Sequence, residues 1–326
     1  MPPEPTSPAV VIRQLGHAYR ATRRHPPRKA LDRLDLTIPS GAFFVLTGPN
    51  GSGKSTLFKI LCGLTRPSTG TIHIFGHDLI AAPRAARAAM GVVFQKPALD
   101  KYLTVEENLR IHADLHDIPP ALFRQRLPEA LAWSDLGERL GERVETLSGG
   151  LARQAELVKV LLHQPALLLL DEPTAGLDPG GRLAFLATLK RLQKKRGVTI
   201  VMTSHLFAEA EKADLVAILR HGKLLALDSP THLSRQLGTE ILVVQGEELD
   251  TVAQDLTRHA GLTLQVQNHE LRIQGESREL LALMAELLQT QRERIHTLAI
   301  KQPALEDVYI HLTGRDLFSD EEEEKR

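Results

Sequence analysis

Two patterns of hydrophobic and polar residues alternate along the chain up to about residue 228. The uninterrupted apolar run at residues 166–170 is typical of a strand buried on both faces of a parallel sheet, and the mostly apolar segments at 43–47 and 198–202 are also predicted as strands. Strands that alternate with helices indicate an α/β core. Apolar spacing predicts helices at 54–61, 150–162 and 181–195 and a helical stretch from 104 to about 139. Further strands are predicted at 10–15, 34–38, 71–75, 92–94, 215–219 and 223–227.

The pattern changes after Ser229, where the order β-α-β-β-α-β predicts a small ferredoxin-like α+β domain. Asn268 lies at the predicted turn between its two middle strands. Its strands are expected at 241–244, 262–266, 271–273 and 295–300, and its helices at 250–258, 279–288 and 304–312. The expected organisation is a disordered N-terminus at 1–8, a domain at 9–228 with a helical subdomain at about 96–160, a regulatory or dimerising domain at 229–315, and a disordered acidic tail at 316–326.

Composition narrows the functional classes. The chain has 326 residues, of which 42% are hydrophobic and 25% charged, as in soluble globular proteins. Its 40 Lys and Arg balance 40 Asp and Glu, so no overall charge attracts nucleic acid or anionic lipid. A single cysteine, Cys62, excludes an internal disulfide framework and favours a reducing compartment. Neither a membrane-spanning run of about 20 apolar residues nor a signal peptide is evident.

A glycine-rich loop joins the strand at 43–47 to the helix at 54–61. It matches G-x-x-x-x-G-K-[ST], the pattern of a phosphate-binding loop. Glycines let backbone N–H groups converge on an anion, and the helix N-terminus adds a positive dipole end. Lys54 would reach the β- and γ-phosphates, and Ser55 would ligate Mg²⁺. The predicted phosphate-binding residues are Gly48, Pro49, Asn50, Gly51, Ser52, Gly53, Lys54, Ser55 and Thr56.

Two carboxylates follow the apolar run at 166–170. Asp171 and Glu172 lie at the carboxyl end of this predicted strand, where ligands bind in open α/β sheets. One carboxylate there can hold Mg²⁺ through its water shell, and the other can accept a proton from an attacking water. An acidic pair alone is also common in solvated turns. Combined with the phosphate-binding loop, it predicts hydrolysis of a nucleoside triphosphate.

A third motif precedes the acidic strand. The segment Leu147-Ser148-Gly149-Gly150-Leu151 resembles the signature sequence of ATP-binding cassette (ABC) ATPases. The resemblance covers about residues 9–228 and implies a phosphate-loop NTPase cassette with a helical subdomain. Four further matches follow in the family's order: Tyr19, Gln95, the segment 175–178 and His205.

The resemblance implies hydrolysis of ATP to ADP and phosphate with Mg²⁺. Tyr19 would stack on adenine, although an ordinary part-buried tyrosine is equally compatible with the sequence. Glu172 would act as general base, and His205 would stabilise charge on the γ-phosphate. The other implied roles are charge compensation by Lys54, and Mg²⁺ binding by Ser55 and Gln95 directly and by Asp171 through water.

The same resemblance implies a symmetric head-to-tail dimer. Ser148, Gly149 and Gly150 of one copy would face the ATP held by the other copy, and Asp178 would lie in the loop that crosses the interface. Leu151 departs from the family, which commonly has Gln there. Because the neighbouring signature residues are intact, we expect retained activity with altered dimer affinity.

A second resemblance concerns the C-terminal region. Residues 303–315 are similar to the closing segment of daunorubicin-resistance-type ATPases, although Ala155 stands where that subfamily usually has leucine. The subfamily implies a separate integral membrane permease, docking near residues 96–104, and a cytoplasmic location on the inner face of the membrane. The alternatives are a soluble ABC ATPase acting on ribosomes or DNA, and a non-catalytic regulatory module. A single set of motifs and a balanced charge disfavour nucleic acid as a partner.

The basic stretch at 20–29 and several histidines carry no assigned role. The stretch fits a solvated loop between strands, with a contact to phosphates or lipid head groups as the alternative. His112 and His116 lie four residues apart on a predicted helix without an evident third ligand. No metal site is therefore expected at His73, His77, His112, His116 or His163.

Overall fold

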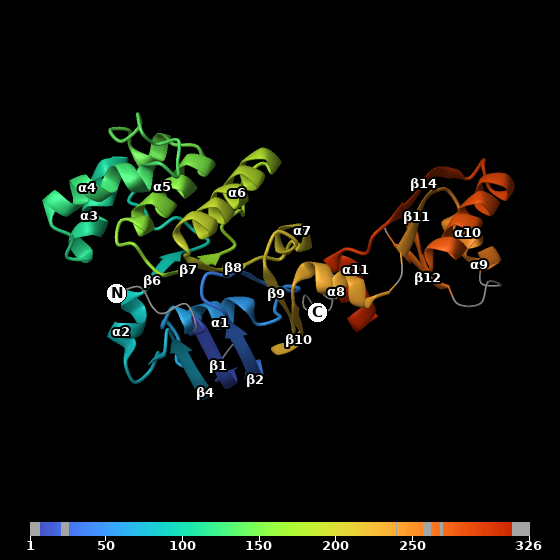
Figure 1. Ribbon diagram of the computed structural model, residues 1–326, viewed down its shortest axis with the longest axis horizontal. Coiled ribbons are helices and arrows are strands. Elements are labelled where there is room, and N and C mark those ends of the chain that lie inside the picture. Colours follow the sequence, from blue (N-terminus) through green and yellow to red (C-terminus); the bar gives the residue numbers. More distant parts are fainter. Residues whose placement is uncertain (1–6, 21–25, 239, 257–261, 268–269, 315–326) are drawn as a thin grey trace. The chain divides into compact units, whose positions relative to one another are not determined.

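The computed structural model describes the chain except residues 1–6, 21–25, 239, 257–261, 268–269 and 315–326 (Figure 1). The described residues form two compact units, one within 7–229 and the other within 230–314. Most of the N-terminus and the acidic tail for which disorder was predicted lie outside the described residues, as do the turn at Asn268 and the end of the helix predicted at 250–258.

A six-stranded sheet forms the centre of the first unit, in the order β10-β9-β3-β8-β7-β6. Its inner strands pair in parallel, and β10 pairs antiparallel with β9 at the edge. All five residues of β3 and of β8 are buried, in keeping with sequences that are apolar apart from threonine. The strands are β3 (Phe43–Thr47), β6 (Met90–Val93), β7 (Leu167–Asp171), β8 (Thr199–Thr203), β9 (Leu215–Arg220) and β10 (Lys223–Asp228).

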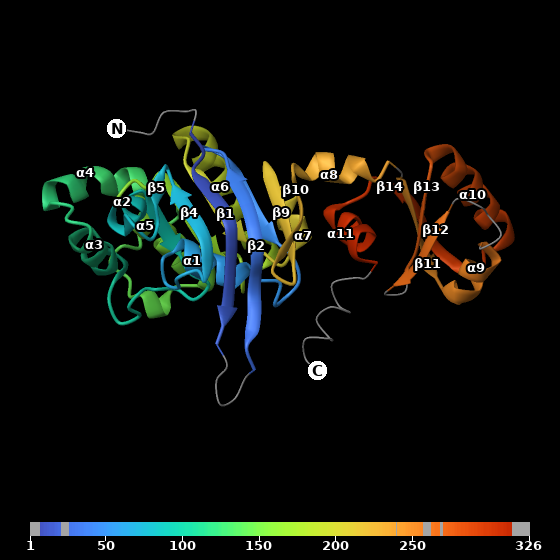
Figure 2. The same cartoon turned by 90° about the horizontal axis from the view of Figure 1, so that it is seen from below.

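A second, antiparallel sheet has the order β2-β1-β4-β5. Its first two strands are longer than predicted, and Figure 2 shows them side by side. Because β2 begins at Arg28, the last two residues of the basic stretch belong to a strand rather than to a loop. The strands are β1 (Val10–Tyr19), β2 (Arg28–Ile38), β4 (Thr69–Ile74) and β5 (His77–Asp78).

The helical stretch predicted at 104–139 contains two helices. Thr104 begins the first with a capping box to Glu107, and Pro119 and Pro120 begin the second. Asp117 between them has a φ of 52°. The helices of the first unit are α1 (Lys54–Leu61), α2 (Pro83–Ala88), α3 (Val105–Leu115), α4 (Pro120–Leu131), η1 (Val144–Thr146), α5 (Gly149–Leu161), α6 (Pro179–Arg196) and α7 (Phe207–Ala210). In Figures 1 and 2, α3, α4 and α5 lie together at one end of this unit.

A hydrophobic core lies between the two sheets of the first unit and includes α1. Phe44 and Leu46 of β3 pack there with Leu57 and Phe58 of α1 and with Ile12 of β1. Each of these side chains is at most 2% exposed, so burial of apolar area fixes the start of α1 against the sheet. The loop before α1 is thereby held at the carboxyl end of β3.

The second unit contains the ferredoxin-like arrangement that the sequence predicts. Its sheet has the order β12-β13-β11-β14, with every pair antiparallel. A separate core forms around Leu242, Ile273 and Leu283. The elements are α8 (Pro230–Gln236), β11 (Glu240–Gly246), α9 (Leu249–Leu256), β12 (Thr263–Gln267), β13 (Glu270–Gly275), α10 (Ser277–Thr290), β14 (Ile295–Lys301) and α11 (Leu305–Thr313). Among the described residues of the whole chain, none of the helices has the length and apolar character needed to cross a bilayer.

Candidate functional site: a nucleotide site at the ends of β3 and β7

The loop between β3 and α1 makes close backbone contacts that only glycine allows. A Cβ on Gly48, whose φ is 138°, would lie 2.1 Å from the carbonyl oxygen of Leu219. A Cβ on Gly53, whose φ is 110°, would lie 2.7 Å from the carbonyl oxygen of Ala30. Both glycines have a backbone conformation that side chains rarely adopt, so the glycines of the motif fix the loop's shape.

Lys54 lies at the first position of α1 and is buried. Its ammonium donates to the carbonyl oxygens of Gly48 at 2.7 Å and Pro49 at 2.8 Å. The buried hydroxyl of Ser52 has no hydrogen-bond partner among the described residues. A buried cation and the positive end of a helix therefore meet inside one loop, which is an arrangement suited to an anion.

A cavity of about 150 Å³ opens beside this loop. Tyr19 lies at its rim, 40% exposed, with its hydroxyl 3.2 Å from that of Thr56. Arg28 donates to the carbonyl oxygen of Gly51 at 3.1 Å, so a basic residue of the stretch at 20–29 reaches the phosphate-binding loop. The lining residues are Tyr19, Arg28, Ala30, Asn50, Gly51, Gly53, Lys54, Ser55, Thr56 and Glu172.

The acidic end of β7 contributes the remaining polar groups. Glu172 lines the cavity, with the side-chain amide of Gln95 donating to its Oε2 at 3.0 Å. Nδ1 of His205 lies 3.5 Å from Oε1 of the same carboxylate. Glu172 has a φ of 41°, so the backbone turns sharply where β7 ends. The structure thus brings together three residues that lie far apart in the sequence.

Asp171, the residue before Glu172, is half-buried. Its Oδ1 accepts a hydrogen bond of 2.6 Å from the hydroxyl of Thr203 on β8. Burial raises the pKa of Asp171, and the nearby charge of Glu172 adds to this effect, whereas Thr203 and the lysines Lys54 and Lys59 oppose it. An added cation would offset the unfavourable burial of this carboxylate.

The signature segment lies at the beginning of α5 and does not line this cavity. Ser148 caps α5 by accepting a hydrogen bond from the backbone N–H of Leu151 at 3.3 Å. Asp178 caps α6 in the same way through Gly181 at 2.8 Å. A Cβ on Gly150 would lie 4.0 Å from Leu177, so these two helix starts are neighbours. Within one chain, the predicted site residues therefore form two groups. One group surrounds the cavity, and the other lies at the beginnings of α5 and α6.

Comparison with known proteins identifies the family. A sequence profile described as ABC transporter matches residues 31–175. The Nod factor export ATP-binding protein I of Rhizobium meliloti is 33% identical over 91% of this chain and 87% of that protein. A daunorubicin resistance ATP-binding protein of Streptomyces coeruleorubidus is 32% identical over 91% of this chain and 95% of that protein. The chain belongs to the ABC transporter family of ATP-binding proteins.

Solved structures agree with this assignment. An ATP-binding subunit of an ABC transporter is 31% identical with a TM-score of 0.62, covering 76% of this chain and 99% of that one. A dimeric ATP-binding cassette in a post-hydrolysis state with ADP and Pi is 25% identical with a TM-score of 0.61, covering 68% and 98%. The predicted fold class and the predicted ABC ATPase activity are confirmed, and the chain binds and hydrolyses ATP to power a transporter.

Two polar residues of this ABC ATPase hold the site together but escaped the sequence analysis. The hydroxyl of Thr203 donates to Asp171 and accepts the backbone N–H of Glu172 at 3.0 Å. Glu209, which is buried, accepts hydrogen bonds from Thr174 at 2.5 Å and from Ser204 at 2.6 Å. Thr174 follows the acidic pair and Ser204 precedes His205. Thr203 and Thr174 each bond to residues at least 31 positions away in the sequence. Sequence spacing alone therefore does not predict these contacts.

A buried ion pair links the signature helix α5 to the Gln95 loop. The guanidinium of Arg153 donates to the carbonyl oxygens of Phe94 at 2.6 Å and Gln95 at 2.5 Å. It also pairs with Glu156 at 3.0 Å, and both side chains are at most 4% exposed. Glu156 in turn accepts the backbone N–H of Ala98 at 2.6 Å. Charges three residues apart on the apolar face of a helix were the sequence signal that could have identified this pair.

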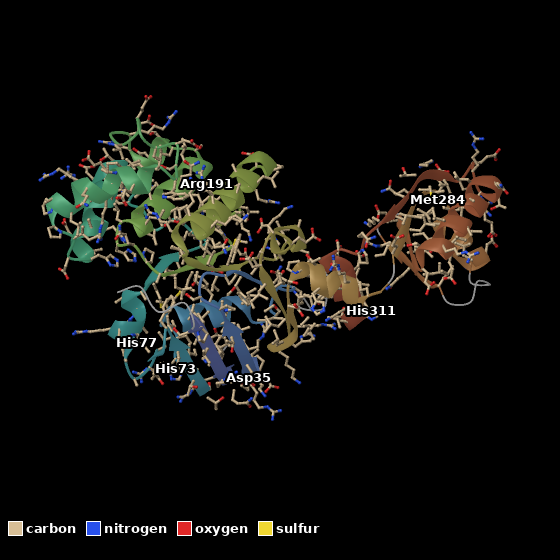
Figure 3. All side chains as sticks on the ribbon, viewed as in Figure 1. Asp35, His73, His77, Arg191, Met284 and His311 are labelled. Atoms are coloured by element: carbon tan, nitrogen blue, oxygen red, sulfur yellow. The ribbon has the colours of Figure 1, made fainter. Side chains whose placement is uncertain are left out.

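The expectation that the histidines lack a third partner is wrong. The imidazoles of His112, His116 and His163 form one group, with their nitrogen atoms within 4.8 Å of one another. His163 is far from the other two in sequence, and only the packing of α3 against α5 brings it near. His73 and His77, labelled in Figure 3, lie instead on β4 and β5.

Proposed function

We propose that the cavity beside α1 binds the phosphates of Mg·ATP. The buried Lys54 and the side chains of Ser55 and Thr56 line this cavity. Asp171 precedes the lining residue Glu172, and a cation would lower the raised pKa of its carboxyl. These oxygen donors suit Mg²⁺, which would be held by Ser55 and Gln95 directly and by Asp171 through water. When bound, Mg²⁺ offsets the negative charge of the phosphates. Tyr19 at the rim would stack on adenine.

Glu172 is the general base in this proposal. Its carboxylate lines the cavity, so Oε1 or Oε2 can take the proton of a water that attacks the γ-phosphate. Gln95 orients that carboxylate through the 3.0 Å hydrogen bond to Oε2. His205, beside Oε1, would stabilise charge on the γ-phosphate. The chain's contribution is mainly positioning and electrostatics.

A second copy of the chain would complete the site. The residues Ser148, Gly149, Gly150 and Asp178 lie outside the cavity that Lys54 and Glu172 line. A symmetric head-to-tail dimer would place each signature helix N-terminus against the ATP held by the other copy. Dimeric cassettes among the solved relatives support this arrangement.

The transport partner would be an integral membrane permease that exports its substrate. The relatives named above are export or resistance ATP-binding proteins, which supports export as the direction. The chain would then lie on the cytoplasmic face of the membrane through that permease. The balanced charge of 40 basic and 40 acidic residues gives no support to the alternative of a ribosome or DNA partner.

The separation of the cavity from the signature helix is the observation that carries this proposal. Glu172→Gln should slow hydrolysis and trap an ATP-bound dimer, measured as a doubling of mass by light scattering in Mg·ATP. Glu172→Gln combined with Ser148→Arg is the matched control, because it keeps the cavity and blocks the opposing surface. A Glu172→Gln protein that stays monomeric at saturating Mg·ATP would contradict the dimer. Stimulation of ATP hydrolysis by the coexpressed product of a neighbouring permease gene would test the transport partner.

A further inference from the structure

Three imidazoles meet where α3 packs on α5. His112 lies in the last turn of α3, His116 is the residue that ends it, and His163 follows α5. Ring centroids are 4.5 Å apart for His112 and His116, 5.4 Å for His112 and His163, and 4.0 Å for His116 and His163. None of these residues lines the nucleotide cavity, and ATP hydrolysis uses none of them.

Two of the nitrogen atoms already have the spacing of metal ligands. Nε2 of His112 lies 3.3 Å from Nδ1 of His163. Two imidazole nitrogens bound to a tetrahedral ion at about 2.0–2.1 Å are separated by about 3.3–3.4 Å. The same distance also permits a hydrogen bond between the rings, so spacing alone does not distinguish the two.

The backbone fixes the tautomer of His163. Its Nε2 lies 3.0 Å from the carbonyl oxygen of Met90 at the start of β6, and the carbonyl can only accept, so Nε2 carries the proton. The lone pair of Nδ1 therefore points toward His112. A histidine that ligates a metal commonly donates its other ring N–H to a carbonyl in this way.

Burial disfavours the charged form of each of the three rings. Burial, with the neighbouring His116, His163 and Lys159, lowers the pKa of His112 to about 3. Burial lowers the pKa of His163 to about 4 against the opposing effect of the Met90 hydrogen bond, with His116 and Arg126 adding to the lowering. Burial also lowers the pKa of His116, although Asp117 opposes this.

The nearby cations are paired with other groups. Lys159 lies 3.6 Å from Glu156 and donates to the carbonyl oxygen of Ala98 at 2.8 Å. Arg126 donates to the carbonyl oxygen of Leu162 at 3.0 Å. The charge of Lys159 is therefore partly compensated by Glu156, and the guanidinium of Arg126 is engaged by a backbone carbonyl.

His116 is the ring of the three that solvent reaches most easily and that has room to rotate. It is exposed, whereas His112 and His163 are half-buried, so an ion can enter from solvent on its side. Its ring stacks on that of His163 at an interplanar angle of 4°, so it must turn to aim a nitrogen at the other two. Its exposed position at the end of α3 leaves room for that rotation.

We propose that His112, His116 and His163 bind one divalent transition-metal ion of the zinc class. Imidazole nitrogens suit Zn²⁺ and its neighbours, and three histidines leave one position for water or another ligand. Bound metal would tie the end of α3 to the chain that follows α5 and, through Met90, to β6. The ion would thereby brace the helical part of the cassette at a point remote from ATP.

Zinc titration of the full-length, nucleotide-free protein by calorimetry tests this site. One Zn²⁺ should bind per chain. His116→Ala should weaken binding by about tenfold or more, because loss of even a group that only supports a ligand costs about 10–100-fold in metal affinity. Because His116 is exposed, this variant should fold, which circular dichroism would verify. His77→Ala, which removes an exposed histidine elsewhere on the same unit, is the matched control and should bind zinc like the wild type.

Cobalt and thermal unfolding supply independent measurements. Co²⁺ should give the intense visible absorption of a four-coordinate site in wild type and in His77→Ala, and the weak absorption of an octahedral ion in His112→Ala and His163→Ala. Zn²⁺ should raise the Tm of wild type but not of His116→Ala. Equal zinc affinity of the wild type and His116→Ala, or an octahedral cobalt spectrum in the wild type, would show that the three rings form only a hydrogen-bonded cluster.

Discussion

The hydroxyl of Thr203 on β8 lies 2.6 Å from Oδ1 of Asp171 on the neighbouring strand β7. The two residues are paired in the register of the parallel sheet. The same oxygen accepts the backbone N–H of Glu172 at 3.0 Å. One hydroxyl therefore positions the carboxylate of Asp171 and the backbone of Glu172.

Thr203→Val should lower ATP turnover by roughly 10–100-fold, because a hydrogen bond to a charged group contributes about 1.5–3 kcal/mol. The shape of valine keeps the strand packed, so the fold should persist. Steady-state phosphate release would measure the effect. Thr199→Val on the same strand is the control, since its hydroxyl accepts the backbone N–H of Gly41 at the opposite end. Equal turnover in the two variants would remove Thr203 from this role.

Glu172→Gln should reduce turnover by roughly 10²–10⁴-fold, the contribution of a general base. The amide cannot accept the proton from water but keeps the size of the side chain and its place in the cavity. ATP affinity, measured with a fluorescent nucleotide, should be unchanged. Glu142→Gln, an exposed carboxylate on the helical part, should retain wild-type turnover. Near-normal hydrolysis by Glu172→Gln would assign the base to another group.

Arg153→Met should destabilise the protein by up to about 3–5 kcal/mol, because it leaves the buried Glu156 carboxylate without its main partner. Combining Arg153→Met with Glu156→Leu should recover much of this stability, measured by urea unfolding. Arg153→Met should also lower ATP turnover, because the carbonyl oxygens of Phe94 and Gln95 lose their hydrogen-bond donor. Turnover should remain low in the double variant, which still lacks that donor. Recovery of both properties together would mean that Arg153 acts through folding alone.

Asp214 should make the free energy of unfolding decrease as the pH falls into the acid range. Burial would raise its pKa, but hydrogen bonds from Lys190, the backbone of Phe43 and Gln193 outweigh burial and lower it. A carboxylate whose pKa is lower in the folded state stabilises the protein above its unfolded pKa, and this contribution is lost as pH falls through the folded value. Asp214→Asn should therefore lower stability at neutral pH by less than about 1 kcal/mol, since the pair is partly exposed.

Urea midpoints at a series of acid and neutral pH values would measure the Asp214 effect. The difference between Asp214→Asn and wild type should vanish at low pH, where the wild-type carboxyl is protonated. Lys190→Met in each background should remove most of the difference at neutral pH. Parallel stability curves for Asp214→Asn and wild type across the whole range would contradict the assignment.

Most of the fold and the main residues of the candidate site were predictable from local sequence motifs. The loop at Gly48–Thr56 and the acidic end of β7 were predictable because each depends on adjacent residues whose chemistry is explicit. Thr203 and Glu209 were not predictable, since ordinary polar residues acquire their role only from partners on other elements. For the same reason, the sequence did not predict that His163 lies near His112 and His116, because only the packing of α5 against α3 brings it there. The helical stretch at 104–139 was predictable from its apolar spacing, but the spacing did not locate the turn at Asp117 that divides it into two helices.

The positive φ of Glu172 restricts which amino acids evolution or a mutational library can place there. A left-handed backbone at a residue other than glycine costs about 1–2 kcal/mol, least for asparagine and aspartate and most for β-branched side chains. Saturation mutagenesis at this codon should therefore enrich glycine and asparagine when cells are selected for soluble protein alone. Selection for a working transporter should instead return glutamate, so the two screens would enrich different amino acids at residue 172.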